Sequence, residues 1–240
     1  MTLQLRYVTH SEIGLIRKNN QDSGYASPHL LVVADGMGGA AAGDLASAVA
    51  IDTIRKIEGP TAGEEMLDVL VGAIHQANDK IAELVESDLS LEGMGTTVTG
   101  AMFDGAQLGL AHIGDSRAYL FRGGELKQLT RDDSWVSAAW AEGILSHDEI
   151  DKHPLRNVIT KAVGAKEEIE LDTVEHQLVK GDVIMLCSDG LHSMINDEAI
   201  LKAVTPFPAT LPEATQKLID AANEAGGKDN VSVVLLRYTE

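Results

Sequence analysis

The 240-residue sequence contains a single cysteine, Cys187, so no internal disulfide can form. Chains without disulfides are typical of reducing compartments, which favours a cytoplasmic protein. Residues 1–10 lack the apolar segment of a signal peptide, and no apolar run approaches the length of a membrane span. We therefore expect a cytoplasmic protein, or the cytoplasmic domain of a protein whose membrane anchor lies outside these residues.

Positive charge is also scarce, because 19 lysines and arginines stand against 37 aspartates and glutamates, for a formal net charge of −18. A nucleic-acid-binding protein needs a basic surface to neutralise phosphates, so this composition argues against nucleic acid as a partner. The same imbalance argues against docking on an anionic membrane. Solubility explains most of the negative charge, and a subset of the carboxylates could hold divalent cations.

Linkers, internal repeats and low-complexity segments are absent, and the sequence predicts one domain over residues 1–240. Hydrophobic residues make up 44% of the chain, which is enough for a substantial core. Because helices and strands do not alternate regularly, we expect an α+β fold with antiparallel sheets. The expected strands cover residues 3–8, 30–34, 96–103, 108–113, 118–122, 126–129, 169–177, 183–186 and 231–238. The expected helices cover residues 41–57, 63–85, 133–142, 147–151 and 211–225, with a further short helix beginning at Pro154.

Four aspartates, Asp35, Asp115, Asp189 and Asp229, lie at strand ends or in the adjoining loops, next to small residues. A strand end holds a carboxylate rigidly, and a neighbouring glycine lets a metal or phosphate approach the backbone. Hard divalent cations prefer oxygen ligands, and converging carboxylates can hold two ions about 3.5–4 Å apart. Each aspartate taken alone is more often a turn residue. Spacing does not show that the four converge, so both interpretations stay open.

Other phosphate-binding patterns were weighed beside these aspartates. Arg17 could capture a phosphate dianion in a bidentate manner, although a surface arginine is the simpler interpretation of its spacing alone. Gly36, Gly38 and Ala41 match a dinucleotide-binding fingerprint. Asp35 would repel a pyrophosphate there, and a second helix follows where a parallel strand is needed, so we reject that interpretation. A P-loop is excluded because no Gly-Lys-Ser/Thr follows the glycines.

Six motifs taken together carry a resemblance to a known family. They are GLIRKNNQD (14–22), ADGMGG (34–39), GMGTT (93–97), HIGDSR (112–117), CSDGL (187–191) and GGKDNVSVV (226–234). In this order they resemble the PPM/PP2C family of metal-dependent Ser/Thr protein phosphatases. The chain is most similar to the small bacterial members, such as the actinobacterial type, that oppose Hanks-type kinases. The match extends from about residue 5 to residue 238.

This resemblance implies a four-layer α-β-β-α sandwich of two antiparallel sheets flanked by helices. It implies an enzyme that hydrolyses phosphoserine and phosphothreonine in proteins by direct attack of a metal-bridging water, without a phosphoenzyme. The expected partners are phosphorylated proteins, Ser/Thr kinases among them, and we expect a monomer. The expected cofactors are two central Mn²⁺ or Mg²⁺ ions, with a third, weaker ion beside them.

The resemblance also implies roles for individual residues of the motifs. Asp35, Asp189 and Asp229 would hold the two central ions, together with the backbone carbonyl of Gly36, and Asp115 with Asp189 would hold the third. Asp22 would act through water, and Arg17 would bind the substrate phosphate. The segment from about residue 137 to residue 156 would correspond to a mobile flap beside the site.

One position departs from the family pattern. Bacterial members usually have a histidine after DGMGG, assigned as the general acid for the leaving group, and this chain has Ala40 there. A positioned acid contributes about 10²–10⁴-fold in rate, because a serine or threonine alkoxide leaves poorly without a proton. His192 is a candidate substitute acid, although it can equally be an ordinary polar residue of a short helix. The alternative is a weakly active or inactive, pseudophosphatase-like module that binds phosphoproteins. We interpret His112 as a structural residue.

Overall fold

The computed structural model describes residues 4–38, 42–57, 66–150, 152–164, 168–207 and 209–239. Its first sheet has the strand order β1-β11-β10-β7-β8, formed by β1 (Gln4–Glu12), β11 (Val231–Thr239), β10 (Val183–Cys187), β7 (Arg117–Arg122) and β8 (Glu125–Gln128). The second has the order β2-β3-β5-β6-β9, formed by β2 (Asp22–Ala26), β3 (Leu30–Met37), β5 (Val98–Asp104), β6 (Gln107–Ile113) and β9 (Asp172–Gln177). The short β4 (Gly95–Thr96) pairs with the end of β3, and every strand pair is antiparallel.

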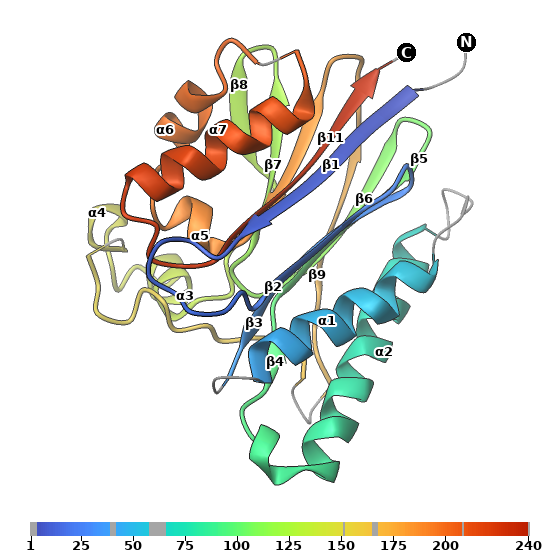
Figure 1. The fold of residues 1–240 in the computed structure, drawn as a ribbon, viewed down its shortest axis with the longest axis vertical. Coiled ribbons are helices and arrows are strands. Elements are labelled where there is room, and N and C mark those ends of the chain that lie inside the picture. Colours follow the sequence, from blue (N-terminus) through green and yellow to red (C-terminus); the bar gives the residue numbers. More distant parts are fainter. Residues whose placement is uncertain are drawn as a thin grey trace.

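Helices cover the outer faces of both sheets (Figure 1). Against the second sheet lie α1 (Ala42–Ile54), with the 3₁₀ turn Arg55–Ile57 after it, and α2 (Met66–Ser87), with the 3₁₀ turn Leu89–Leu91 after it. Against the first sheet lie α5 (Asp189–His192), α6 (Asp197–Ala203) and α7 (Leu211–Glu224). Two further helices, α3 (Trp135–Ala141) and α4 (His147–Ile150), lie in the connection between β8 and β9. The predicted four-layer sandwich is confirmed.

Alternate residues of the central strands face two different cores. In β3, Leu30 and Val32 pack against the helices, whereas Leu31 and Val33 pack between the sheets. In β10, Met185 faces the helices on the opposite side of the molecule. Both faces of these strands are therefore buried, which explains why they are continuous apolar runs in the sequence rather than alternating ones.

The structure differs from the expected elements at three places. β2 and α6 were not expected, and the helix expected from Pro154 is wrong. That segment forms single turns instead. The Arg156 amide donates to the His153 carbonyl over 3.1 Å, and the Val158 amide donates to the Leu155 carbonyl over 3.1 Å. Among the described helices, none is long and apolar enough to cross a membrane.

Candidate active site

The four strand-end aspartates come from both sheets and meet where the sheets adjoin. Asp35 lies near the end of β3 and Asp115 just after β6, whereas Asp189 follows β10 and Asp229 precedes β11. Burial raises the pKa of Asp35 well above its usual range, and the charges of Asp22, Asp189, Asp115 and Asp229 raise it further. Because these charges act on one carboxyl group, the five side chains form one cluster, which we call the carboxylate cluster.

The backbone around Asp35 is fixed on both sides. Its amide donates to Thr97 Oγ1 over 3.0 Å, and its carbonyl accepts from the Thr97 amide over 2.9 Å and from Thr96 Oγ1 over 2.9 Å. A Cβ atom on the next residue, Gly36, would fall 1.9 Å from the carbonyl oxygen of Gly43 in α1. Only glycine therefore fits at position 36, and the close packing of β3 on α1 holds Asp35 at the strand end.

Asp22 and Asp189 lie on either side of Asp35. Asp22 is the register partner of Asp35 across the β2–β3 pair, so the two side chains share one face of the sheet. Burial raises the pKa of Asp22 to about 6, although Ser188 Oγ donates to its Oδ2 over 2.6 Å. Burial also raises the pKa of Asp189 to about 8, and the charges of Asp115 and Asp229 add to the shift. Without a cation, burial makes the charged form of each of these carboxyl groups less favourable than it is in water.

Asp115 is buried, and its Oδ1 has no hydrogen-bond partner; the same holds for Oδ1 of Asp22. Burial and the charge of Asp132 raise the pKa of Asp115 to about 7. Two hydrogen bonds to Asp133 hold the preceding residue, Gly114. The Gly114 amide donates to Asp133 Oδ2 over 3.1 Å, and the Asp133 amide donates to the Gly114 carbonyl over 2.7 Å. The Asp133 carbonyl also accepts from the amide of Thr160 over 2.8 Å. Asp133 therefore links the loop of Asp115 to the chain just after the 137–156 segment.

Arg17 reaches the cluster from the loop between β1 and β2. Its Nη2 lies 2.5 Å from Asp229 Oδ2, and this hydrogen bond raises the pKa of the guanidinium. Both side chains remain partly exposed, so a phosphate could approach them from solvent. The structure thus brings Arg17 together with the aspartates that the sequence singled out.

Asn230 is a contributor that the sequence analysis missed. Its Nδ2 donates to the carbonyls of Ile13 over 3.0 Å and Asn19 over 2.9 Å, and its Oδ1 accepts from the amide of Gln21 over 2.9 Å. One buried amide side chain therefore fastens both ends of the Arg17 loop beside Asp229. Its position directly after Asp229 was the only signal in the sequence.

His192 lies at the end of α5 with its Nε2 2.9 Å from the backbone carbonyl of Asp115. A carbonyl can only accept, so Nε2 carries the hydrogen of this bond. Burial lowers the pKa of His192 to about 3, which keeps the ring neutral. A neutral ring whose hydrogen is held by a carbonyl has no proton ready for a leaving group, so this contact weighs against the expected acid role. Ala40 lies outside the described residues.

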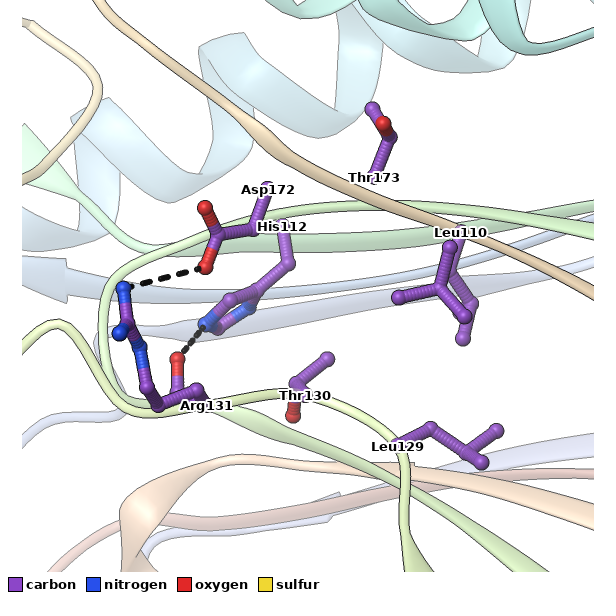
Figure 2. A pocket seen from close by; sticks show the side chains of 8 residues that line it. Leu110, His112, Leu129, Thr130, Arg131, Asp172 and Thr173 are labelled. Atoms are coloured by element: carbon purple, nitrogen blue, oxygen red, sulfur yellow. Dashed lines mark hydrogen bonds and ion pairs between the residues drawn. The ribbon is translucent and has the colours of Figure 1, made fainter.

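A cavity of about 280 Å³ is lined by His112 and Arg131 but by none of the expected site residues (Figure 2). At its rim, Arg131 lies 3.8 Å from Asp172. His112 Nε2 donates to the Arg131 carbonyl over 3.1 Å, and its Nδ1 lies 2.8 Å from Thr99 Oγ1. With both ring nitrogens engaged and the side chain buried, His112 has the structural role expected of it.

The carboxylate cluster fits divalent cations by its chemistry. All its donors are oxygens, two buried carboxylate oxygens lack partners, and burial together with neighbouring negative charges raises the pKa values of Asp35 and Asp189. Among the described residues, no group of three or more acidic, histidine or cysteine side chains is placed to hold a metal ion as it stands.

Comparisons with known proteins agree with this geometry. The family model described as "Protein phosphatase 2C" matches residues 17–224. The chain is 44% identical over 235 residues to the serine/threonine protein phosphatase PstP of Mycobacterium tuberculosis, covering 98% of this chain and 45% of PstP. It is 35% identical over 232 residues to the serine/threonine phosphatase stp of Listeria innocua, covering 93% of this chain and 92% of stp.

Solved structures give the same result. A crystal structure of M. tuberculosis PstP superposes with a TM-score of 0.94 at 42% identity, covering 100% of both chains. The catalytic domain of PstP in complex with two manganese ions superposes with a TM-score of 0.92 at 41% identity, again covering 100% of both chains. The chain spans 45% of the length of full-length PstP.

Proposed function

The chain belongs to the protein phosphatase 2C family, and on that basis we propose that it is a metal-dependent enzyme that removes phosphate from phosphoserine and phosphothreonine in proteins. The observation that carries this proposal is the carboxylate cluster, in which four aspartates act on Asp35 while Arg17 pairs with Asp229 at the edge. Phosphoryl transfer needs positioning and charge stabilisation more than covalent chemistry, and this cluster can supply both.

The proposed cofactors are two Mn²⁺ or Mg²⁺ ions held by Asp35, Asp189, Asp229 and the carbonyl of Gly36. The manganese-bound PstP structure supports the number and kind of ions. Asp115 together with Asp189 would hold a third, weaker ion, and the partnerless Oδ1 of Asp115 supports that assignment. When bound, such ions would acidify water for attack on phosphorus and neutralise charge on the phosphoryl oxygens.

The chain's own residues orient the substrate and the cluster. Arg17 binds the phosphate dianion through its planar fork, and its bond to Asp229 places that fork beside the metal-binding carboxylates. Thr97 fixes the backbone of Asp35, and Ser188 orients Asp22 for a water-mediated role. We assign His192 to positioning the Asp115 backbone, so that the proton for the leaving oxygen comes from water.

We further propose that residues 1–240 form one catalytic domain that acts as a monomer in the cytoplasm, or on the cytoplasmic side of a membrane. Its substrates would be phosphorylated proteins, Hanks-type Ser/Thr kinases among them. The net charge of −18 gives no support for a nucleic-acid partner. The activity and substrates of any longer protein that contains this chain are part of the same proposal.

The test compares phosphate release from a phosphothreonine peptide and from p-nitrophenyl phosphate, each with Mn²⁺ and with EDTA. Nitrophenolate leaves without a proton, whereas the threonine alkoxide needs one. We expect Mn²⁺-dependent turnover of both substrates. Turnover of the aryl ester alone would locate a defect at leaving-group protonation.

Ala40 favours a second candidate function, that of a phosphoprotein-binding module with little turnover. The same assay separates the two. If neither substrate is hydrolysed with Mn²⁺ although phosphopeptide still binds, the binding module is the correct function.

A further inference from the structure

Two large aliphatic side chains lie exposed directly before Arg17. Leu15 is 65% exposed and Ile16 is 68% exposed, and Ile13 nearby is 39% exposed. Scattered exposed apolar residues are normal on a protein surface. These are distinguished by their place, because they adjoin the arginine that binds the substrate phosphate.

The loop that carries them is rigidly fastened. The amide of Leu15 donates to the carbonyl of Gly227 over 2.7 Å, and Asn230 holds the carbonyls of Ile13 and Asn19. Gly227 has a φ of +50°, and a Cβ atom there would fall 2.7 Å from Leu15 Cγ, so the Leu15 side chain lies directly over this glycine. Holding exposed aliphatic side chains in place reduces the entropy lost when a partner packs against them.

The reach of a substrate peptide matches this arrangement. A peptide whose phosphate is held by Arg17 would run close to the loop that carries this arginine. Leu15 and Ile16 are two residues and one residue before Arg17, so the backbone distance from Leu15 to Arg17 is at most about 7 Å. The same span covers about two residues of an extended peptide on either side of its phosphoresidue. A side chain of the substrate within that distance can therefore reach Leu15 and Ile16.

We propose that Leu15 and Ile16 form a docking surface for an apolar side chain of the substrate, located within about two residues of the phosphoserine or phosphothreonine, and that they thereby determine substrate specificity. This inference rests on the proposed function. The occupant is the phosphorylated segment of a substrate protein, because the surface is continuous with the residue that holds its phosphate. Selection arises when the substrate side chain leaves water and covers the two aliphatic groups.

A second set of exposed apolar side chains lies on the 137–156 segment, where Ile144 is 64% exposed. Among the described residues, the backbone hydrogen bond of Ile144 goes to Ala139, and none joins Ile144 to the Arg17 loop. If an apolar preference came from that segment, it would not depend on Leu15 or Ile16. Ile144→Ser therefore serves as the rival variant in the test.

The experiment uses the Mn²⁺-loaded chain and a set of phosphothreonine peptides. The peptides come in pairs, one pair for each of the three positions on either side of the phosphothreonine. The two members of a pair differ only at that position, which is leucine in one and serine in the other. The readout is kcat/KM for each peptide divided by kcat/KM for p-nitrophenyl phosphate, which carries no flanking residue. For the wild type we expect leucine to be preferred about 10-fold at one or more positions, mostly through KM, as is typical of an aliphatic group in an apolar site.

Leu15→Ser, Ile16→Ser and the double variant should each reduce that preference, and the double variant should bring it near one. Val179→Ser is the matched control, because Val179 is a 49% exposed aliphatic residue whose amide donates to Asp182, and Asp182 is bonded to Tyr238, at the end of β11 opposite to Asn230 and the Arg17 loop. It should keep the wild-type preference, as should Ile144→Ser. If Leu15→Ser unfolds because Leu15 also covers Gly227, Ile16→Ser alone still decides the test.

A wild type without apolar preference, or a preference that survives the double variant, would overturn the proposal. Loss of the preference in Ile144→Ser with retention in the double variant would transfer the docking surface to the 137–156 segment and equally overturn it. Failure of the proposed function looks different, since the wild type would then not hydrolyse p-nitrophenyl phosphate with Mn²⁺ at all.

Discussion

Buried aspartates occur in two settings in this chain, and their partners differ. Asp132 accepts two hydrogen bonds from Arg117, over 2.8 Å and 2.7 Å, and Asp182 accepts two from Arg122, over 2.9 Å and 2.6 Å. Burial alone would raise the pKa of each carboxyl group, but the hydrogen bonds and charge of the arginine lower it instead. We call these the compensated pairs.

The carboxylate cluster lies beside the Arg117–Asp132 pair but has no comparable compensation. Burial and neighbouring negative charges raise the pKa values of Asp35, Asp115 and Asp189. Among the residues that the structure describes, Arg17 is the arginine that pairs with the cluster, and it contacts Asp229 at the exposed edge. The fold pairs other buried carboxylates with arginine but leaves this group without such partners, which supports the proposal that the group holds a cation that is not part of the chain. On that proposal, compensation separates structural carboxylates from functional ones.

The largest effect is expected from removing a carboxylate of the cluster. Asp35→Asn or Asp189→Asn should lower kcat for p-nitrophenyl phosphate at least about 10³-fold, because a bound metal contributes several kcal/mol of charge stabilisation. In EDTA the same variants should be at least as stable as the wild type, since each removes a source of repulsion. Kinetics and thermal unfolding with and without Mn²⁺ check both statements. Full activity in either variant would contradict the two-metal assignment.

Breaking a compensated pair should have the opposite signature. Arg117→Met leaves Asp132 without its partner and should destabilise the fold by about 3 kcal/mol, with or without Mn²⁺. Urea unfolding in EDTA measures this change. Arg131→Met is the control, because its ion pair with Asp172 is long and exposed, so a change within about 0.5 kcal/mol is expected. Equal effects of the two variants would remove the distinction between the settings.

The comparison also predicts how metal-free stability depends on pH. The pKa values of Asp115 and Asp189 are raised in the folded state to about 7 and about 8, so between pH 6.5 and 8.5 the folded chain binds more protons than the unfolded one. Stability from these groups is therefore present at the lower pH and is lost as pH rises through the folded pKa values. In EDTA the Tm should fall over this range, and Asp189→Asn should flatten the fall. His192, whose pKa is lowered in the folded state, contributes in the opposite direction, and that contribution is largely complete at the start of this window. A Tm that rises with pH in EDTA would contradict the repulsion.

Substituting His192 is expected to have the smallest effect on turnover. This side chain lies between the cluster and the compensated pairs, because it donates to the Asp115 carbonyl and is close to Arg117. His192→Gln retains an amide donor, so the ratio of phosphothreonine turnover to aryl ester turnover should change less than about 2-fold. A fall of about 10²-fold in peptide turnover alone would instead restore His192 as the general acid. Ala40→His is the complementary variant, and it should raise peptide turnover more than aryl ester turnover.

Much of the fold was predictable because the central strands are buried on both faces. The apolar runs at 30–34 and 183–186 gave β3 and β10, and the glycine turns at Gly105 and Gly123, each with a φ of 60°, marked the hairpins between the strands that follow. β2 was missed because four of its five residues are only partly buried, the exception being Asp22, and the strand has no clear alternation. α6 was missed although Asn196 caps it and two acidic residues begin it, because the helix has only seven residues.

The site was harder to predict than the fold. The sequence could place each aspartate at or near a strand end, but Asp35 lies in β3 of the second sheet and Asp115 in the connection from β6 to β7 between the sheets. Asp189 follows β10 and Asp229 precedes β11, both strands of the first sheet. Their convergence depends on how the sheets pack, which local pattern does not contain. The resemblance to a family supplied that information, whereas Asn230 and Asp133, which hold the loops, had no chemical pattern of their own.

The central claim is that the uncompensated cluster is a divalent-cation site. Isothermal titration of the EDTA-treated and dialysed chain with Mn²⁺ tests it most directly, with Asp189→Asn and Arg131→Met titrated in parallel. The account predicts at least two bound ions per chain in the wild type and in Arg131→Met, and fewer in Asp189→Asn. Absence of binding in the wild type, or the same stoichiometry and affinity in Asp189→Asn, would contradict it.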